Sequence, residues 1–358
     1  PLSDNNLMGR TSFVTTFLFV PWLVGNLLLF ADRTIFDQAR YVIFLAPALC
    51  LALARPVGAA LPGIRWTGWA ISSLAFVVFL TALPFNWTVE TRREEWRATA
   101  RYLATHSGPD DIILLHADYT ARPFLYYYQG EAEVIYPFTG AIESEDQLEP
   151  VLSQVVKHPT VWLVRSHWEI HDPRGLLDRW LAQRYPLITE LYPPGIIVKG
   201  YATSYQFDAP PPDAVLLDAV FDGRLKLAAC QINPTQTEAQ DDLFHPPSGW
   251  VHATLYWQAA EPLVTAYRPT VKLIDELGQV WGNRLERSLN TMGMVPPPQW
   301  LVGKYIRDDY DINLNPATPP GIYRIEVGLQ SLNGTLLPVT YGGVESEHVI
   351  CGLVEIVE

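Results

Sequence analysis

The sequence predicts a multidomain membrane protein: transmembrane α-helices, then a small α/β three-layer domain, then an antiparallel β-sandwich. Three observations lead to this fold class. The first quarter of the chain contains three long apolar runs, the middle alternates short apolar runs with patterns of helical period, and the last part alternates apolar and polar residues one by one. A chain of 358 residues has the length of two or three domains. The predicted domains are residues 1–90, 91–205 and 206–358.

The first domain is predicted to cross the membrane three times. About 20 apolar residues are needed to span about 30 Å of hydrocarbon, and the three runs approach this length. They occupy residues 11–31, 41–61 and 66–89. The middle run is uncharged for only 14 residues, so that by itself it also fits a buried core helix. Arg55 and Arg65 flank the second loop with no acid between them, which predicts a cytoplasmic loop. We therefore expect a multi-pass protein of the plasma membrane with residues 91–358 on the extracytoplasmic side.

The charge of the chain is unevenly distributed. The formal net charge is −13, but residues 1–90 contain five arginines against four acids. The other two domains therefore carry all of the excess negative charge. Proteins that bind nucleic acid need a basic face, so nucleic acid is excluded as a partner.

The second domain shows the strand and helix pattern of an α/β fold. Thr91 and Glu94 are spaced as a capping box for a helix that places Trp96, Thr99, Ala100 and Leu103 on one face. The apolar run 112–115 follows a turn sequence and predicts a buried parallel strand. Further elements are expected in order along the chain: a helix over 148–155, a strand over 160–164, a helix opened by Asp172 and Pro173, and strands near 187–192 and 195–199.

The third domain begins after a proline-rich linker at 209–212. From there, alternation of period two predicts eight or nine strands of an antiparallel sandwich. In the strand around 251–257, Leu255 belongs to one face and His252 to the other. Trp250 and Trp257 are seven residues apart and so occupy opposite faces, which predicts that at most one of them is buried in the core. The tryptophans of this domain are either core residues or platforms for sugar rings.

Cysteines and histidines offer two further possibilities. Cys230 and Cys351 are either free or joined by a disulfide, which an extracytoplasmic location would permit. His167 and His171 have the i, i+4 spacing of a metal-binding pair on a helix. Their position between a strand end and a Pro-capped helix nevertheless favours a surface loop. No cofactor is indicated. A divalent cation is compatible with the sequence, although no ligand set for it is visible.

Candidate binding residues follow the predicted strand at 112–115. His116 and Asp118 lie at its carboxyl end, where open α/β sheets gather their ligands. Tyr119 and Arg122 add aromatic and cationic groups that suit a sugar or another acceptor. The alternative is that these aromatic residues fill the interface between the domain and the membrane. No glycine-rich phosphate loop or nucleophile elbow occurs, which argues against a nucleotide-binding or hydrolase domain.

Several segments of the chain carry a resemblance to a known family. They include RREEWRATARYLATHSGPDDIILLH, YYYQG, YWQAAEPL, VKLIDELGQVWGN, QWLVGKYIRDDYDINL and PPGIYRIEVGLQ, after an Arg-Tyr pair at the mouth of an apolar run. Together they resemble the C-terminal part of bacterial GT-C glycosyltransferases, the relatives of dolichyl-phosphate-mannose-protein mannosyltransferases and of aminoarabinose transferases. The last four segments are similar to the β-sandwich often appended to such enzymes in filamentous bacteria.

The resemblance implies a polyprenyl-phosphate-linked sugar as donor and a glycan or protein as extracytoplasmic acceptor. Arg40 and Tyr41 then either bind the lipid phosphate or serve as interfacial anchors among membrane lipids. In the family the catalytic carboxylate lies on the first external loop, so the catalytic residues are expected upstream of this chain. We therefore expect a fragment of a membrane glycosyltransferase that is inactive by itself. The alternative is a non-enzymatic, membrane-anchored cell-surface protein whose sandwich binds a glycan or a partner.

Overall fold

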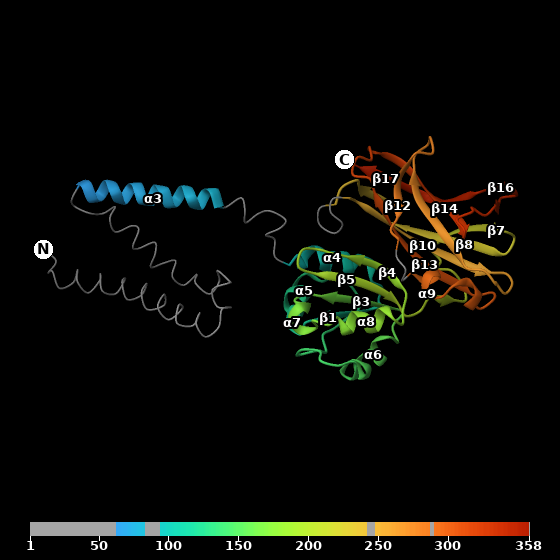
Figure 1. Ribbon diagram of the computed structural model, residues 1–358, viewed down its shortest axis with the longest axis horizontal. Helices are drawn as coiled ribbons and strands as arrows, with labels where there is room; N and C mark the ends of the chain where they lie inside the picture. Colours follow the sequence, from blue (N-terminus) through green and yellow to red (C-terminus); the bar gives the residue numbers. More distant parts are fainter. Residues whose placement is uncertain (1–61, 83–93, 242–247, 287–289, 358) are drawn as a thin grey trace. The chain divides into compact units, whose positions relative to one another are not determined.

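The computed structural model describes residues 62–82, 94–241, 248–286 and 290–357 (Figure 1). The chain divides into two compact units, Pro1–Thr91 and Arg92–Glu358. In the first unit the described element is helix α3, Pro62–Ala82. The predicted membrane spans over 11–31 and 41–61, and the candidate residues Arg40 and Tyr41, lie outside the described residues.

The predicted fold class of a multi-pass membrane protein is wrong. Within the described ranges, no helix combines the length and the apolarity that crossing a membrane requires. Helix α3 covers most of the predicted third span and has 21 residues. Its first half, however, mixes glycine, arginine, threonine and serine with the apolar residues, so that only Leu74–Leu80 is apolar throughout.

An α/β layer forms the first part of the second unit. Its helices are α4 (Trp96–His106), α5 (Ala121–Tyr127), α6 (Glu149–Val155), α7 (Trp168–His171) and α8 (Leu176–Ala182). Its strands are β1 (Ile112–His116), β2 (Glu133–Ile135), β3 (Thr160–Arg165), β4 (Leu187–Leu191) and β5 (Ile197–Ala202). The short 3-10 helices η6 (Asp118–Thr120) and η7 (Glu145–Gln147) precede α5 and α6.

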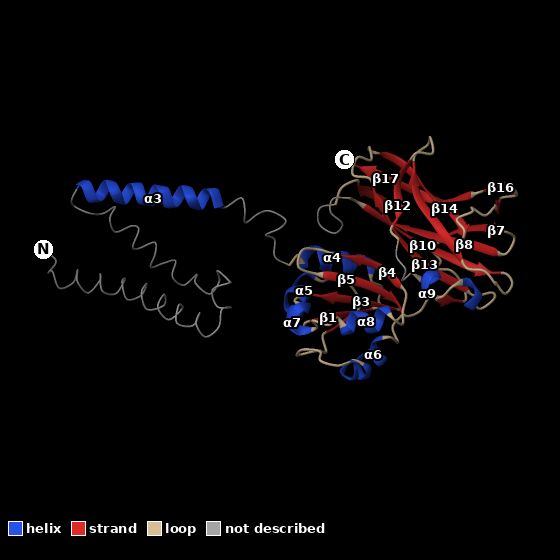
Figure 2. Ribbon diagram, viewed as in Figure 1, coloured by secondary structure: helices blue, strands red, loops and turns tan. Residues whose placement is uncertain are grey.

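The strands of this layer form one mixed sheet in the order β2-β1-β3-β5-β4. Strands β2, β1 and β3 are parallel, whereas β5 is antiparallel to β3 and β4. Helices α4 and α5 cover one face and α6 and α8 the other (Figures 1 and 2). Every residue of β1 is buried, because helices pack on both faces of the strand. Asp172 accepts hydrogen bonds from the first amides of α8, those of Leu176 and Leu177, and so stabilises the start of this helix.

The remainder of the second unit is a single 12-stranded sheet, almost entirely antiparallel (Figure 2). Its strands are β6 (Gln206–Phe207), β7 (Val215–Phe221), β8 (Leu225–Asn233), β9 (Gln236–Glu238), β10 (Trp250–Ala259), β11 (Tyr267–Ile274), β12 (Val280–Arg284), β13 (Tyr305–Leu314), β14 (Gly321–Ser331), β15 (Val339–Tyr341), β16 (Val344–Ser346) and β17 (His348–Val357). The short elements α9 (Thr291–Met294) and η8 (Pro297–Gln299) lie between β12 and β13.

This sheet folds back on itself around one apolar core. Leu255 and Trp257 of β10 are fully buried there, together with Ile325 and Val327 of β14. A disulfide joins Cys230 of β8 to Cys351 of β17 across the core. The sequence predicts two separate sheets. Instead the short pairing of β12 with β13 makes the hydrogen bonding continuous from one half to the other.

The other face of β10 packs on the α/β layer. Trp250 is buried among residues of α4 and β3, and its ring lies 5.8 Å from that of Tyr102. Trp257 is buried on the opposite face, in the core of the large sheet. The prediction that at most one of these two tryptophans is buried is therefore wrong, because both faces of the strand are covered.

We predict that the Cys230–Cys351 disulfide stabilises the large sheet by about 2–4 kcal/mol, since it closes a loop of 121 residues in the unfolded chain. Urea unfolding of the double variant Cys230→Ala/Cys351→Ala measures this loss. Cys50→Ala is the matched control, because it removes the third cysteine and leaves the disulfide intact. Rapid alkylation of Cys230 and Cys351 in the native protein without reductant would contradict the prediction.

Candidate functional site

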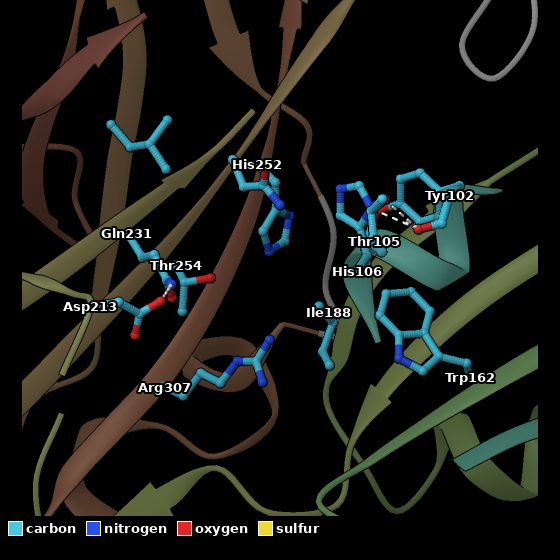
Figure 3. A pocket seen from close by; sticks show the side chains of 13 residues that line it. Tyr102, Thr105, His106, Trp162, Ile188, Asp213, Gln231, His252, Thr254 and Arg307 are labelled. Atoms are coloured by element: carbon cyan, nitrogen blue, oxygen red, sulfur yellow. Dashed lines mark hydrogen bonds between the residues drawn. The ribbon is translucent and has the colours of Figure 1, made fainter. Parts of the chain in front are cut away.

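A cavity of about 400 Å³ lies between the α/β layer and the large sheet (Figure 3). Its wall on the α/β side includes Tyr102, Thr105, His106, Trp162, Ile188 and Thr189. Its wall on the other side includes Asp213, Gln231, Asn233, His252, Thr254 and Arg307. Aromatic rings therefore face a wall rich in hydrogen-bonding groups. Most binding sites for small molecules combine these two properties.

A buried ionic network supports the polar wall. His252 of β10 contacts two carboxylates of β13: its Nδ1 lies 2.7 Å from Asp311 Oδ1, and its Nε2 lies 3.0 Å from Asp309 Oδ1. The two aspartates alternate along β13 and so share one face of the strand. Both ring nitrogens are donors only in the protonated imidazole, and this arrangement therefore favours a charged His252.

Hydrogen bonds from three other side chains complete the network. Arg307 Nε donates to Asp309 Oδ2 over 2.9 Å, and Thr254 Oγ1 donates to Asp309 Oδ1 over 2.8 Å. Thr189 of β4 donates to Asp311 Oδ2 over 2.8 Å. This last bond connects the α/β layer with the large sheet, because its partners belong to different layers.

The pKa values follow from this geometry. Burial lowers the pKa of His252, but the hydrogen bonds to Asp309 and Asp311 outweigh this effect and raise the pKa to about 9. Burial raises the pKa of Asp309, but the charges of Arg307 and His252 reverse this and hold it below its usual value. At neutral pH His252 and Arg307 are therefore cations and Asp309 is a carboxylate.

The opposite wall is uncharged. His106 stacks on Tyr102 with ring centroids 3.9 Å apart, and its Nδ1 lies 2.8 Å from the carbonyl oxygen of Tyr102. Burial lowers the pKa of His106, so its imidazole is neutral at neutral pH. Trp162 is adjacent, with its ring 6.2 Å from that of Tyr102. At the rim of the other wall, Gln231 Nε2 donates to Asp213 Oδ2 over 2.5 Å.

The residues predicted from the strand at 112–115 gather elsewhere, at the carboxyl end of β1. His116 is completely buried, and neither of its ring nitrogens has a hydrogen-bond partner among the described residues. Burial lowers its pKa to about 4. Tyr119 is half exposed, and its ring lies 5.4 Å from that of His171. Asp118 begins η6, and Arg122 is exposed on α5. None of the four lines the cavity between the layers.

Two further predictions concern the same end of the α/β sheet. Glu94, predicted to close a capping box, instead accepts hydrogen bonds from Ser166 and from the ring of Trp96. His167 Nε2 also contacts Glu94, at 2.5 Å. His171 ends helix α7, whereas His167 precedes it. In the part of the chain that the structure describes, no three His, Cys, Asp or Glu side chains are grouped as metal ligands.

The cavity residues were not identified from the sequence. One feature of the sequence could have indicated them: β13 contains the run Arg307-Asp308-Asp309-Tyr310-Asp311. Four charged residues within five positions are unusual in a strand that also carries buried apolar residues. Its pairing with His252 joins positions 57 and 59 residues apart. That register is set by the sheet topology and leaves no local trace in the sequence.

Comparison with known proteins does not identify a family. No family model matches the chain, and no curated protein sequence matches it significantly.

We predict that stability falls as the pH rises from about 6 to about 9. His252 has a pKa of about 9 when folded against 6.5 ordinarily, so its contribution is complete below pH 6.5 and is lost as pH rises through 9. Burial raises the pKa of Asp308 to about 7, which adds a further loss as pH rises from 3.8 through 7. Together the two groups predict a loss on the order of several kcal/mol.

Urea unfolding measured from about pH 4 to about pH 10 covers the titration of both groups and measures the effect. Asp308→Asn is expected to remove the part of the slope below pH 7 and to leave the part due to His252. Asp208→Asn is the matched control, because the Asp208 side chain is 90% exposed and its replacement is expected to leave the pH profile unchanged. A wild-type profile that is flat or that rises above pH 7 would contradict the prediction.

Proposed function

We propose that this chain is part of a glycosyltransferase that uses a polyprenyl-phosphate-linked sugar, and that the cavity between the two layers binds the acceptor glycan. The family resemblance of the segments around Trp96, Tyr128 and Tyr310 supports the reaction class. The composition of the cavity supports a role for the described residues in binding the acceptor glycan.

The observation that carries this proposal is the composition of the cavity wall. Tyr102 and Trp162 line the cavity with aromatic surface on which the apolar C–H face of a sugar ring can pack. Opposite them, Gln231, Asp213 and Arg307 offer planar polar groups to sugar hydroxyls. These groups are held by hydrogen bonds within the protein, so ordering them on binding costs little entropy.

In the proposed reaction the bond between the sugar C1 and the phosphate oxygen of the donor breaks. A bond forms between C1 and a hydroxyl oxygen of the acceptor, which loses its proton to a base, and polyprenyl phosphate departs. None of the described residues is assigned as that base. The cavity contributes by holding the acceptor.

The disulfide between Cys230 and Cys351 supports an extracytoplasmic location for the large sheet, because disulfides persist in oxidising compartments. This location agrees with the side of the membrane on which such transferases use their acceptors.

A non-enzymatic cell-surface protein that binds glycans would use the same cavity in the same way. The two functions differ in one respect: only a transferase consumes the polyprenyl-phosphate donor. Transfer of a radiolabelled sugar to glycan, measured in membranes that contain the protein together with any upstream segment, separates them.

We predict that the full chain binds glycans and that Gln231→Ala weakens this binding by about 5- to 10-fold, which corresponds to the loss of one hydrogen bond. A glycan array identifies a ligand, and calorimetry with that ligand measures the dissociation constant. Gln299→Ala is the matched control, since Gln299 is exposed on η8 and does not line the cavity. Equal affinities of the two variants, or no glycan binding at all, would contradict the proposal.

A further inference from the structure

We infer that the glycan bound in the cavity carries an anionic group, a carboxylate or a phosphate ester, that contacts Arg307 beside His252. This inference rests on the proposed function and specifies its ligand. It follows from the orientation of the ionic network relative to the cavity.

The carboxylates of the network are hidden behind its cations. The side chains of Asp309 and Asp311 are 2% and 0% exposed, whereas those of His252 and Arg307 are 13% and 22% exposed. Both cations line the cavity, and neither carboxylate does. A ligand in the cavity therefore meets the cationic side of the network.

Hydrogen bonding leaves one donor group available. The two ring nitrogens of His252 are hydrogen-bonded to Asp309 and Asp311, and Arg307 donates from Nε and Nη2 to Asp309. Arg307 Nη1 has no hydrogen-bond partner among the residues that the structure describes. Figure 3 shows the guanidinium extending from β13 toward the cavity. A charged N–H group of this kind binds an anionic oxygen about twice as strongly as a neutral one.

The other charged and titratable groups near the network do not cancel this preference. His106 on α4 is neutral, because burial lowers its pKa. Asp213 is exposed at the rim, where it accepts a hydrogen bond from Gln231 and where solvent and salt screen its charge. Tyr256 on β10 is uncharged at neutral pH, because burial raises its pKa to about 12. Asp111 also acts on Arg307, and its Oδ2 accepts hydrogen bonds from the Gly108 amide and from Trp162 Nε1.

Three matched monosaccharides test the inference by calorimetry with the full chain: glucose, glucuronate and glucose 6-phosphate. We expect at least one anionic sugar to bind about 10-fold or more tightly than glucose, as a charge-assisted hydrogen bond predicts. Comparison of glucuronate with glucose 6-phosphate decides between a carboxylate and a phosphate ester. A higher salt concentration is expected to weaken the binding of the anionic sugars and to leave the binding of glucose unchanged.

A pair of charge-matched variants tests the location. Thr105→Asp places a carboxylate in the cavity wall without touching the network. It is expected to weaken binding of the anionic sugar about 10-fold or more relative to its effect on the binding of glucose. Gln299→Glu adds the same charge outside the cavity and is expected to leave the binding of both sugars unchanged. Thermal unfolding of both variants confirms that they are folded.

Each outcome of these experiments supports or overturns a specific part of the inference. If glucose binds as tightly as both anionic sugars, the inference is overturned while glycan binding by the cavity stands. If Thr105→Asp and Gln299→Glu affect the anionic sugar equally, the assigned location is wrong. If none of the three sugars binds at millimolar concentration, both the inference and the proposed role of the cavity are overturned.

Discussion

The cavity and the joint between the two layers both depend on the clamping of His252 between Asp309 and Asp311. Burying an isolated carboxylate costs several kcal/mol, and two on one strand face would also repel each other. A protonated histidine that donates one ring N–H to each carboxylate compensates for the burial of both carboxylates and reduces their mutual repulsion. Arg307 bonds to Asp309, and Thr189 bonds to Asp311. Because His252 holds both aspartates in place, it also helps to position these two side chains.

This clamp relates the fold to the proposed function. Strand β10 is buried on both faces, with Trp257 in the core of the large sheet and Trp250 against the α/β layer. Apolar contact at Trp250 and the hydrogen bond from Thr189 to Asp311 hold the layers together, and the cavity lies between them. Its polar groups are therefore in place before a ligand arrives, which lowers the entropic cost of binding. The same network, viewed from the cavity, presents its cations.

Local patterns in the sequence predicted individual elements well. The run 112–115 forms a buried parallel strand, and helix α4 buries Trp96 and Leu103, because periodicity and burial agree in these segments. The same approach failed for the predicted span over 66–89, where run length favoured a membrane helix that the described helix α3 does not support. It also assigned His252 to the face of its strand away from the core without seeing that the α/β layer covers this face. The bond between Thr189 and Asp311 joins positions 122 residues apart, and no local pattern reports such a contact.

The measurement that tests this account most directly is the pKa of His252, followed by NMR of the ring carbons and nitrogens in the native protein. We predict a pKa of about 9, with both ring nitrogens protonated at neutral pH. Replacement of Asp309 or Asp311 by asparagine, where the variant folds, is expected to lower that value. A pKa at or below the ordinary 6.5 would show that His252 is neutral in the folded protein. The cationic clamp at the cavity wall, and the anion preference inferred from it, would then both be wrong.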